Sequence, residues 1–99
     1  NKRVVSEKYK EYFEDSEIEF VSELKESKSN YWLNSLVFQD VQQRNLFLSE
    51  TNSNGVMTLP IWTLMIVLRI FKYSQKCDLT NAERIESRVV NIPSSVTVL

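Results

Sequence analysis

Few side chains in this sequence could carry out chemistry on their own. The 99 residues include no histidine and a single cysteine, Cys77. A Ser–His–Asp or Cys–His site needs an imidazole base, and a zinc site needs several thiolate, imidazole or carboxylate ligands. Glu17 and Glu19 share one face of an expected strand and could form an acid–base pair, but a solvated outer face is the favoured interpretation. The sequence therefore predicts no catalytic residue and no metal ligand.

The apolar run from Val56 to Met65 contains residues that could bind a ligand, although none that could catalyse a reaction. Trp62 follows a turn and Pro60, on the second apolar face of an expected helix, where a ligand or another domain could reach it. Thr58 and Thr63 could hydrogen-bond a ligand, although local capping of the helix start explains them equally well. A helix that is apolar on every face must be covered by other surfaces, either of this chain or of a partner.

Composition narrows the classes of partner. With 12 Lys and Arg against 13 Asp and Glu, the net charge of -1 lacks the basic field that phosphates require. The run from Val56 to Phe71 is too short to cross a membrane, and Pro60 and Arg69 interrupt it. The single Cys77 and the absence of an apolar signal segment are typical of a cytoplasmic protein. We expect no nucleic acid and no membrane partner.

The first half of the chain alternates helical and strand patterns. Apolar residues at offsets of four and seven predict a helix over residues 2–14, and alternation predicts a strand over residues 17–21. Residues 31–38 are apolar on both faces, which predicts a central strand with Trp32 in the core. Asp40 and Gln43 form a capping box that opens a second helix. That helix is expected to end at Asn54-Gly55, where glycine permits a positive φ.

The second half of the chain also alternates strand and helix patterns. A short strand over residues 56–58 leads to Pro60, which suits the first turn of a helix that is apolar on two sides. Thr80 and Glu83 predict a capped last helix, and residues 89–93 a final strand. We therefore expect one domain, residues 1–99, of the α/β class in an α+β two-layer arrangement. Its small antiparallel or mixed sheet should hold about three strands packed against helices.

Several runs of residues, in order along almost the whole chain, match a pattern that is known in one family. They are Ser29-Asn30-Tyr31-Trp32-Leu33-Asn34, Thr51-Asn52-Ser53-Asn54-Gly55-Val56-Met57-Thr58, Pro60-Ile61-Trp62-Thr63-Leu64-Met65, Asn81-Ala82 and Val90-Asn91-Ile92-Pro93-Ser94-Ser95-Val96. The chain resembles the C-terminal small domain of a DegT/DnrJ/EryC1/StrS aminotransferase. Within that family it is most similar to the branch that acts in legionaminic-acid, perosamine and related surface-sugar pathways.

The resemblance implies the C-terminal domain of a fold-type I aminotransferase that uses pyridoxal phosphate. In that class the large domain carries the cofactor lysine and most cofactor contacts, and none of the seven lysines here lies in such a motif. We therefore expect the cofactor in the intact parent and none on this fragment, which alone should be inactive. The parent is expected to be a homodimer that transfers an amino group to a nucleotide-linked 4-keto-6-deoxy sugar in surface polysaccharide biosynthesis.

The same resemblance places residues 55–65 along the active-site cleft, and Thr58, Pro60 and Trp62 are the expected substrate-binding residues. The chain departs from its relatives at Leu59, where an Arg is usual, and at Ile66, Val67 and Arg69, where Asn, Lys and Pro are usual. The planar fork of an Arg donates two hydrogen bonds to a phosphate at once, and a leucine donates none.

One alternative belongs to a different class of protein. The chain could be a free-standing interaction module that docks onto a partner, or onto itself, through the apolar helix near Trp62 to Phe71. Composition alone does not separate this hypothesis from the aminotransferase one. The polypeptide upstream of Asn1 would separate the two hypotheses, because the enzyme needs several hundred further residues that include a cofactor lysine.

Overall fold

The structure is a computed structural model in which residues 1–95 are described. Val96, the last residue of the runs quoted above, and the rest of the predicted domain to residue 99 lie outside the described residues. Helix α1 spans Lys2–Phe13, and the Asn1 side chain caps it by accepting hydrogen bonds from the N–H groups of Arg3 and Val4. The first predicted helix is therefore confirmed.

Four short strands form one antiparallel sheet in the order β1-β2-β4-β3. They are β1 (Glu19–Phe20), β2 (Asn34–Val37), β3 (Leu59–Pro60) and β4 (Val89–Ile92). The central pair is β2 and β4, with Leu36 opposite Val90. The α+β class and the small sheet are confirmed, with one strand more than expected.

Helix α2 (Val41–Ser53) begins and ends as the sequence predicts. The Asp40 carboxylate accepts a hydrogen bond of 2.7 Å from the N–H of Gln43, which satisfies one of the free donors at the helix start. Beyond the last turn, Gly55 has a φ of 80°, a conformation that glycine adopts without a Cβ penalty. The chain then turns back toward the sheet.

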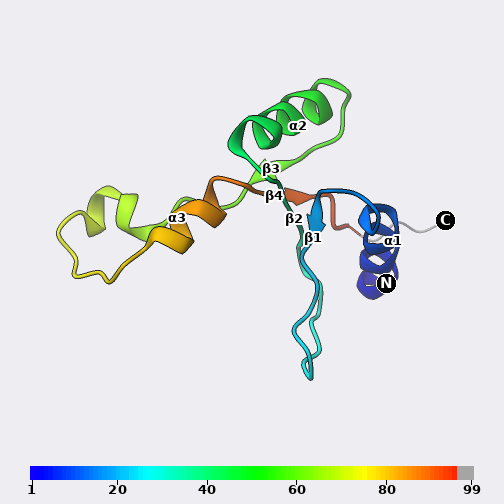
Figure 1. Cartoon of the computed structure of the whole chain (residues 1–99), viewed down its shortest axis with the longest axis horizontal. Helices are drawn as coiled ribbons and strands as arrows, with labels where there is room; N and C mark the ends of the chain where they lie inside the picture. The colour runs from blue at the N-terminus through cyan, green and yellow to red at the C-terminus, as the bar shows by residue number, and fades with distance from the viewer. Residues whose placement is uncertain (96–99) are drawn as a thin grey trace.

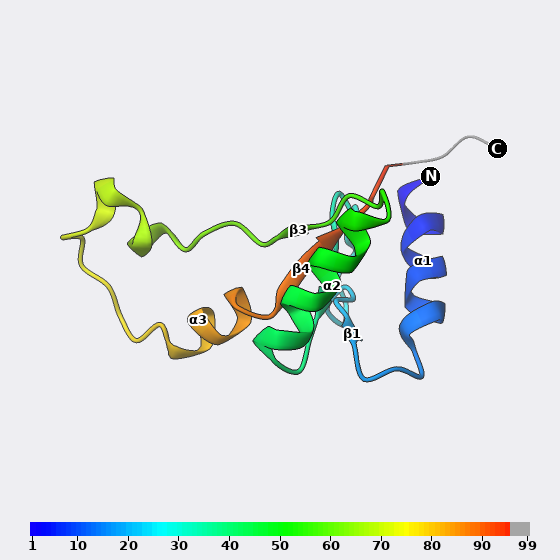
Figure 2. The ribbon, with the colours of Figure 1, turned by 90° about the horizontal axis from the view of Figure 1, so that it is seen from above.

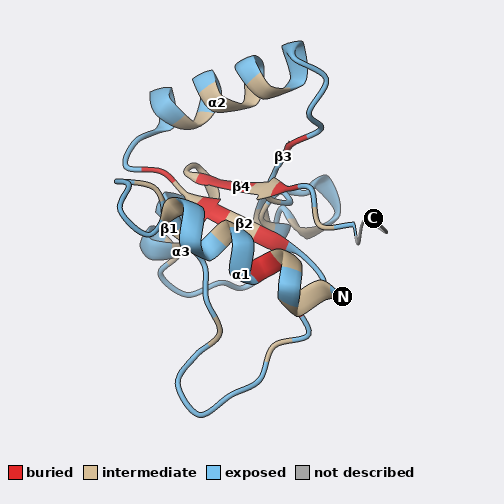
Figure 3. Ribbon diagram, turned by 90° about the vertical axis from the view of Figure 1, so that its right-hand side faces the viewer, coloured by how far each residue is buried: buried red, intermediate tan, exposed pale blue. Residues whose placement is uncertain are grey.

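The core lies where the helices meet the two central strands. Leu36 and Val90 are fully buried, and Phe38 and Ile92 complete the buried cluster. Partly buried side chains from α1, α2 and the β1 region pack around it: Tyr9, Phe13, Ile18, Phe20, Phe47 and Leu48. Figure 3 shows most of the buried residues on β2 and β4, and long exposed stretches elsewhere. Burial is therefore concentrated in a small part of the chain.

The helix predicted after Pro60 is wrong. Pro60 belongs to the edge strand β3, where a missing N–H costs no ladder bond. Residues 61–64 run without regular structure into two short 3₁₀ turns, η1 (Met65–Val67) and η2 (Arg69–Phe71). Leu64 and Leu68 have extended ψ angles of 140° and 137°, which interrupt any continuous helix. The strand expected over residues 56–58 is also displaced, because pairing begins at Leu59.

Residues 61–79, here called the arm, project from the sheet and return through α3 (Thr80–Glu86) (Figures 1 and 2). The last helix that the sequence predicted is confirmed as α3, but Thr80 is not its N-cap residue. The Asp78 carboxylate accepts hydrogen bonds from both the N–H and the hydroxyl of Thr80, at 3.0 and 2.6 Å. These two bonds, the side-chain one first, lower the pKa of Asp78.

The arm and the long loop between β1 and β2, which also projects from the sheet (Figure 1), make the chain less compact than its length allows. The radius of gyration is 15.2 Å, against about 12.6 Å for a compact domain of this length. The accessible surface is 8008 Å², whereas a compact chain of this mass exposes about 5,900 Å². About 2,100 Å² of surface therefore remains exposed that a self-contained domain would bury.

Candidate functional site

A groove between the sheet edge and the base of the arm is the candidate site. Its volume is about 510 Å³, within the range of small-molecule sites. We call it the Trp groove, and it is lined by Lys2, Trp32, Leu33, Met57, Leu59, Trp62, Asn91, Ile92, Pro93, Ser94 and Ser95. Segments from both ends of the chain and from its middle therefore meet here.

Two indole rings stand side by side in the Trp groove. The ring centroids of Trp32 and Trp62 are 6.2 Å apart with a tilt of 59°. Both side chains are well exposed, 62% for Trp32 and 69% for Trp62. Such a pair offers apolar faces on which a sugar ring or a nucleobase can stack.

The prediction that Trp32 lies in the core is wrong. Tyr31 has a φ of 48°, which breaks the strand alternation one residue earlier. It is Tyr31 that is buried, at 7% exposure, with the Arg3 guanidinium 5.4 Å from its ring centroid. Regular pairing starts only at Asn34. The break turns Trp32 outward to the groove.

The polar groups of the Trp groove favour an anionic or hydroxyl-rich ligand. Lys2 supplies the only charge among the lining residues, and its ammonium donates a hydrogen bond of 2.6 Å to the carbonyl of Ser94. An ammonium has three donors, so two remain for a ligand. Asn91 accepts a hydrogen bond from the Ser35 hydroxyl at 2.6 Å, which fixes the orientation of its amide. Among the described residues, no carboxylate lines the groove to repel a phosphate.

Thr58 is buried between two residues that line the Trp groove, Met57 and Leu59. Its side chain is only 2% exposed, and its hydroxyl lies 2.6 Å from that of Thr51. Because the Thr51 hydroxyl also lies 2.7 Å from the Phe47 carbonyl and donates there, Thr58 must be the donor in the pair. It also accepts a hydrogen bond from Asn52 at 3.0 Å. These bonds tie the approach to β3 onto the end of α2.

Of the three residues expected to bind substrate, the structure places only Trp62 in the Trp groove. Pro60 is exposed on β3, opposite Val90, and Thr58 is buried. Both stay predictions as substrate contacts. The sequence prediction omitted Trp32, Lys2 and Asn91. A polar Asn91 inside the apolar run of β4 was the available signal.

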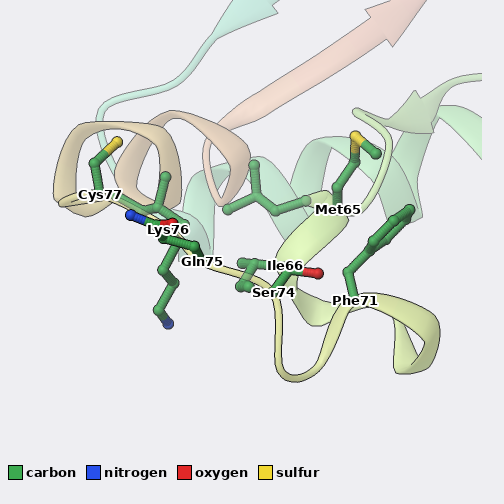
Figure 4. A pocket seen from close by; sticks show the side chains of 9 residues that line it. Met65, Ile66, Phe71, Ser74, Gln75, Lys76 and Cys77 are labelled. Atoms are coloured by element: carbon green, nitrogen blue, oxygen red, sulfur yellow. The ribbon is translucent and has the colours of Figure 1, made fainter.

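A second hollow lies within the arm and has a volume of about 420 Å³ (Figure 4). Met65, Ile66 and Phe71 face the returning stretch, where Lys76 and Cys77 lie. Its lining is mainly apolar and, among residues 1–95, contains no carboxylate. Within residues 1–95 no cluster of three or more His, Cys, Asp or Glu could hold a metal ion.

Among the described residues, neither the Trp groove nor the arm hollow has a lining that fits pyridoxal phosphate. That cofactor needs a lysine amine, a partner for its pyridinium nitrogen and a cradle for its phosphate. The Trp groove and the arm hollow each contain one lysine, Lys2 and Lys76, but no carboxylate to partner the ring nitrogen. We therefore assign no step of cofactor chemistry to these residues.

A comparison with protein families matches residues 1–98 to the DegT/DnrJ/EryC1/StrS aminotransferase family. No curated protein matches the chain. None of the helices within residues 1–95 is long and apolar enough to span a membrane.

Solved structures with the same fold include three aminotransferases. The aminotransferase TlmJ from Streptoalloteichus hindustanus superposes with a TM-score of 0.80 at 18% identity, covering 94% of this chain and 25% of that one. Spr1654 from Streptococcus pneumoniae, assigned as a sugar aminotransferase and solved in its PLP form, gives 0.82 at 18% identity, covering 99% and 26%. The sugar aminotransferase CalS13 from Micromonospora echinospora gives 0.73 at 16% identity, covering 94% and 25%. The chain thus spans about a quarter of the length of these proteins.

Proposed function

Because the chain belongs to the DegT/DnrJ/EryC1/StrS aminotransferase family, we propose that it is the C-terminal small domain of a sugar aminotransferase that uses pyridoxal phosphate. Residues 1–99 form that domain, and a large domain elsewhere in the parent holds the cofactor lysine. The fragment itself is not catalytic. Its part is to form one wall of the substrate cleft.

The Trp groove is the observation that supports this role. It combines two exposed indoles, one ammonium and one fixed amide in a volume suited to a small molecule. A nucleotide-linked sugar has the matching parts, a flat base or ring to stack and a phosphate to pair with Lys2. The similar structures are about four times as long, which agrees with a parent that contributes the remaining wall.

Each residue has a distinct part in this proposal. Trp62 and Trp32 stack on the substrate, and Lys2 takes the anionic group that an Arg at position 59 would otherwise bind. Thr58 and Pro60 set the path of the chain between α2 and Trp62, so they act on the substrate through Trp62. When bound to the parent, pyridoxal phosphate supplies the electron sink for amino-group transfer.

The finer identity follows the resemblance of the sequence. The substrate is a nucleotide-linked 4-keto-6-deoxy sugar, in the legionaminic-acid or perosamine branch of the family. The parent is a cytoplasmic homodimer that serves surface polysaccharide biosynthesis. Leu59 in place of the usual Arg predicts weaker binding of the phosphate than in relatives.

The alternative, an interaction module, loses the helix on which it depended, because residues 61–71 form no α-helix. The exposed apolar residues of the arm still favour a contact with another surface. A small domain of a larger enzyme accounts for this exposure together with the family match, so it is the better explanation.

The test uses the natural polypeptide that includes the sequence upstream of Asn1. We expect visible absorbance from bound pyridoxal phosphate and amino transfer to a 4-keto sugar nucleotide. Trp62→Ala should raise KM about tenfold through loss of stacking, and Trp62→Phe should recover most of it. Tyr12→Ala, which removes an exposed aromatic outside the groove, is the matched control. A parent without bound cofactor would overturn the proposal, and an unchanged KM would remove Trp62 from it.

A further inference from the structure

We propose that Arg3 is a positioning residue of the Trp groove: it holds the loop before β2 so that Trp32 stands beside Trp62. Arg3 does not line the groove and acts through Trp32. The inference deepens the proposed function, on which it rests for the ligand that the two indoles bind. It stands on hydrogen bonds, on one cation–π contact and on the backbone of Tyr31.

The loop between β1 and β2 needs an anchor before it can place Trp32. It projects from the sheet (Figure 1), and between residues 24 and 30 only Ser29 is not exposed. Regular pairing with β4 starts only at Asn34. Exposed loops move unless contacts hold them, so the direction of Trp32 depends on what the base of the loop is tied to.

Arg3 ties both ends of this loop to one side chain. Its guanidinium donates to the two carboxylate oxygens of Glu23 at 2.9 and 3.2 Å, and to the carbonyl of Ser29 at 2.8 Å. The N–H of Ser29 donates to the same carboxylate at 2.6 Å, which closes a ring of hydrogen bonds. The exposed part of the loop therefore begins and ends at one guanidinium.

The same guanidinium holds the residue next to Trp32. It lies 5.4 Å from the centroid of the Tyr31 ring, and the Tyr31 hydroxyl accepts a hydrogen bond of 3.1 Å from the N–H of Glu23. Tyr31 has a φ of 48°, a conformation that a non-glycine residue keeps only where its surroundings hold it. These contacts therefore maintain the turn that directs Trp32 to the groove.

The spacing of the two indoles decides how they hold a ligand. Their centroids are 6.2 Å apart, within the range of aromatic rings in contact, so no ligand ring fits between them. They instead form one apolar face, across which a flat group can lie. If the loop moved, only Trp62 would remain, and the face would shrink to a single ring. Arg3 thus controls the area that is available for stacking.

The chemistry of arginine suits this role, and helix stability does not explain it. A guanidinium is planar and has five donors, so it can bind a carboxylate through two bonds, reach a carbonyl and cover a ring at once. A lysine keeps the charge but not this geometry. Because Arg3 lies in the first turn of α1, its charge opposes the helix dipole and does not favour the helix.

Circular dichroism of the 99-residue chain tests the positioning, because Trp32 and Trp62 are its only tryptophans. Two coupled indoles give a pair of far-ultraviolet bands of opposite sign, which Trp32→Phe should abolish. Arg3→Met should remove most of this couplet, and Arg3→Lys should restore only a minor part of it. Lys8→Met, which removes an exposed cation from the same helix, is the matched control and should leave the couplet unchanged.

Urea unfolding verifies that each variant is folded. Glu23→Gln, which alters one partner of Arg3 and leaves the arginine in place, is the milder variant to use if Arg3→Met unfolds the chain, and it should also weaken the couplet.

Kinetics of the longer parent test the consequence for the substrate. Trp32→Ala should raise KM about tenfold and Arg3→Met about threefold, through loss of stacking. The kcat should change little, because stacking binds substrate and transition state alike. The double variant should have the KM of Trp32→Ala alone, since Arg3 acts only through Trp32, whereas an independent structural effect would add to it.

An intact couplet in a folded Arg3→Met chain would overturn the inference, as would full restoration by Arg3→Lys or KM effects that add. The proposed function fails in a different way. A Trp32→Ala parent with unchanged KM would remove Trp32 from the substrate site, and the couplet would still decide whether Arg3 positions that indole.

Discussion

Thr58 shows how one buried hydroxyl can hold the chain beside a groove that it does not line. Replacing it by the isosteric valine removes the bond to Thr51 and the bond from Asn52. We expect Thr58→Val to lower the free energy of unfolding by about 1–2 kcal/mol, and Thr58→Ser to lower it by less. Thr63→Val, on the exposed stretch after Trp62, should stay within about 0.5 kcal/mol. Urea unfolding measures all three, and equal effects of Thr58→Val and Thr63→Val would contradict the assignment.

The roles of single residues were predictable from sequence where they depend only on neighbouring residues in the chain. Asp40, Gln43 and Gly55 follow from cap and turn chemistry, which depends on near neighbours in the chain. Trp32 was not predictable, because its outward direction depends on the positive φ of Tyr31. The exposure of Trp62 was expected, but the indole beside it was not.

At the scale of elements, the long loop between β1 and β2 is anchored to α1 by one charged contact. Arg3 donates to both oxygens of Glu23, at 2.9 and 3.2 Å, and to the carbonyl of Ser29 at 2.8 Å. The N–H of Ser29 in turn donates to Glu23 at 2.6 Å. The Arg3 bond first, and then the Ser29 bond, lower the pKa of Glu23 from 4.5 to about 2. The loop that leads to Trp32 is therefore fixed at its base.

This anchor predicts a defined pH dependence. Since the pKa of Glu23 is lower in the folded chain than in the unfolded chain, its ionised form stabilises folding above about pH 4.5, and this contribution is lost as the pH falls toward 2. Glu23→Gln should therefore lower the thermal midpoint at pH 7, and the difference from the original chain should shrink between pH 4.5 and 2. The pair is partly exposed, so added salt should weaken the effect. Glu11→Gln, which removes an exposed carboxylate of α1 with no ion pair within residues 1–95, is the matched control.

Among the elements, the sequence predicted α1, α2 and the two central strands, because their apolar residues face a core within the chain. It also predicted α3, although no residue of that helix is buried. In the arm, the same apolar periodicity predicted a helix that does not form. Its apolar residues recur at helical spacing, but many of them, such as Met65, Val67 and Ile70, are exposed, and most helical stability comes from packing of a covered face. Branched Ile66, Val67 and Ile70 also lose side-chain freedom in a helix. Periodicity indicates a helix only where a partner surface is present.

At the scale of the whole molecule, the exposed surface predicts a weak response to denaturant. An unfolded chain of this mass exposes about 17,000 Å², so folding to 8008 Å² removes about 9,000 Å² from water, against about 11,000 Å² for a compact chain. The m-value scales with this area and should therefore lie about a fifth below that of a compact domain of the same length. The heat-capacity change of unfolding should be reduced in parallel.

The measurement is urea unfolding at protein concentrations low enough for the chain to be monomeric, repeated after tenfold dilution to verify this. Association would add buried surface and make the midpoint depend on concentration. The same experiment on the longer parent should restore the m-value expected for its length, because the arm and the Trp groove are then covered. An m-value of the isolated chain equal to that of a compact domain would show that the arm folds back in solution, and would contradict the shape described.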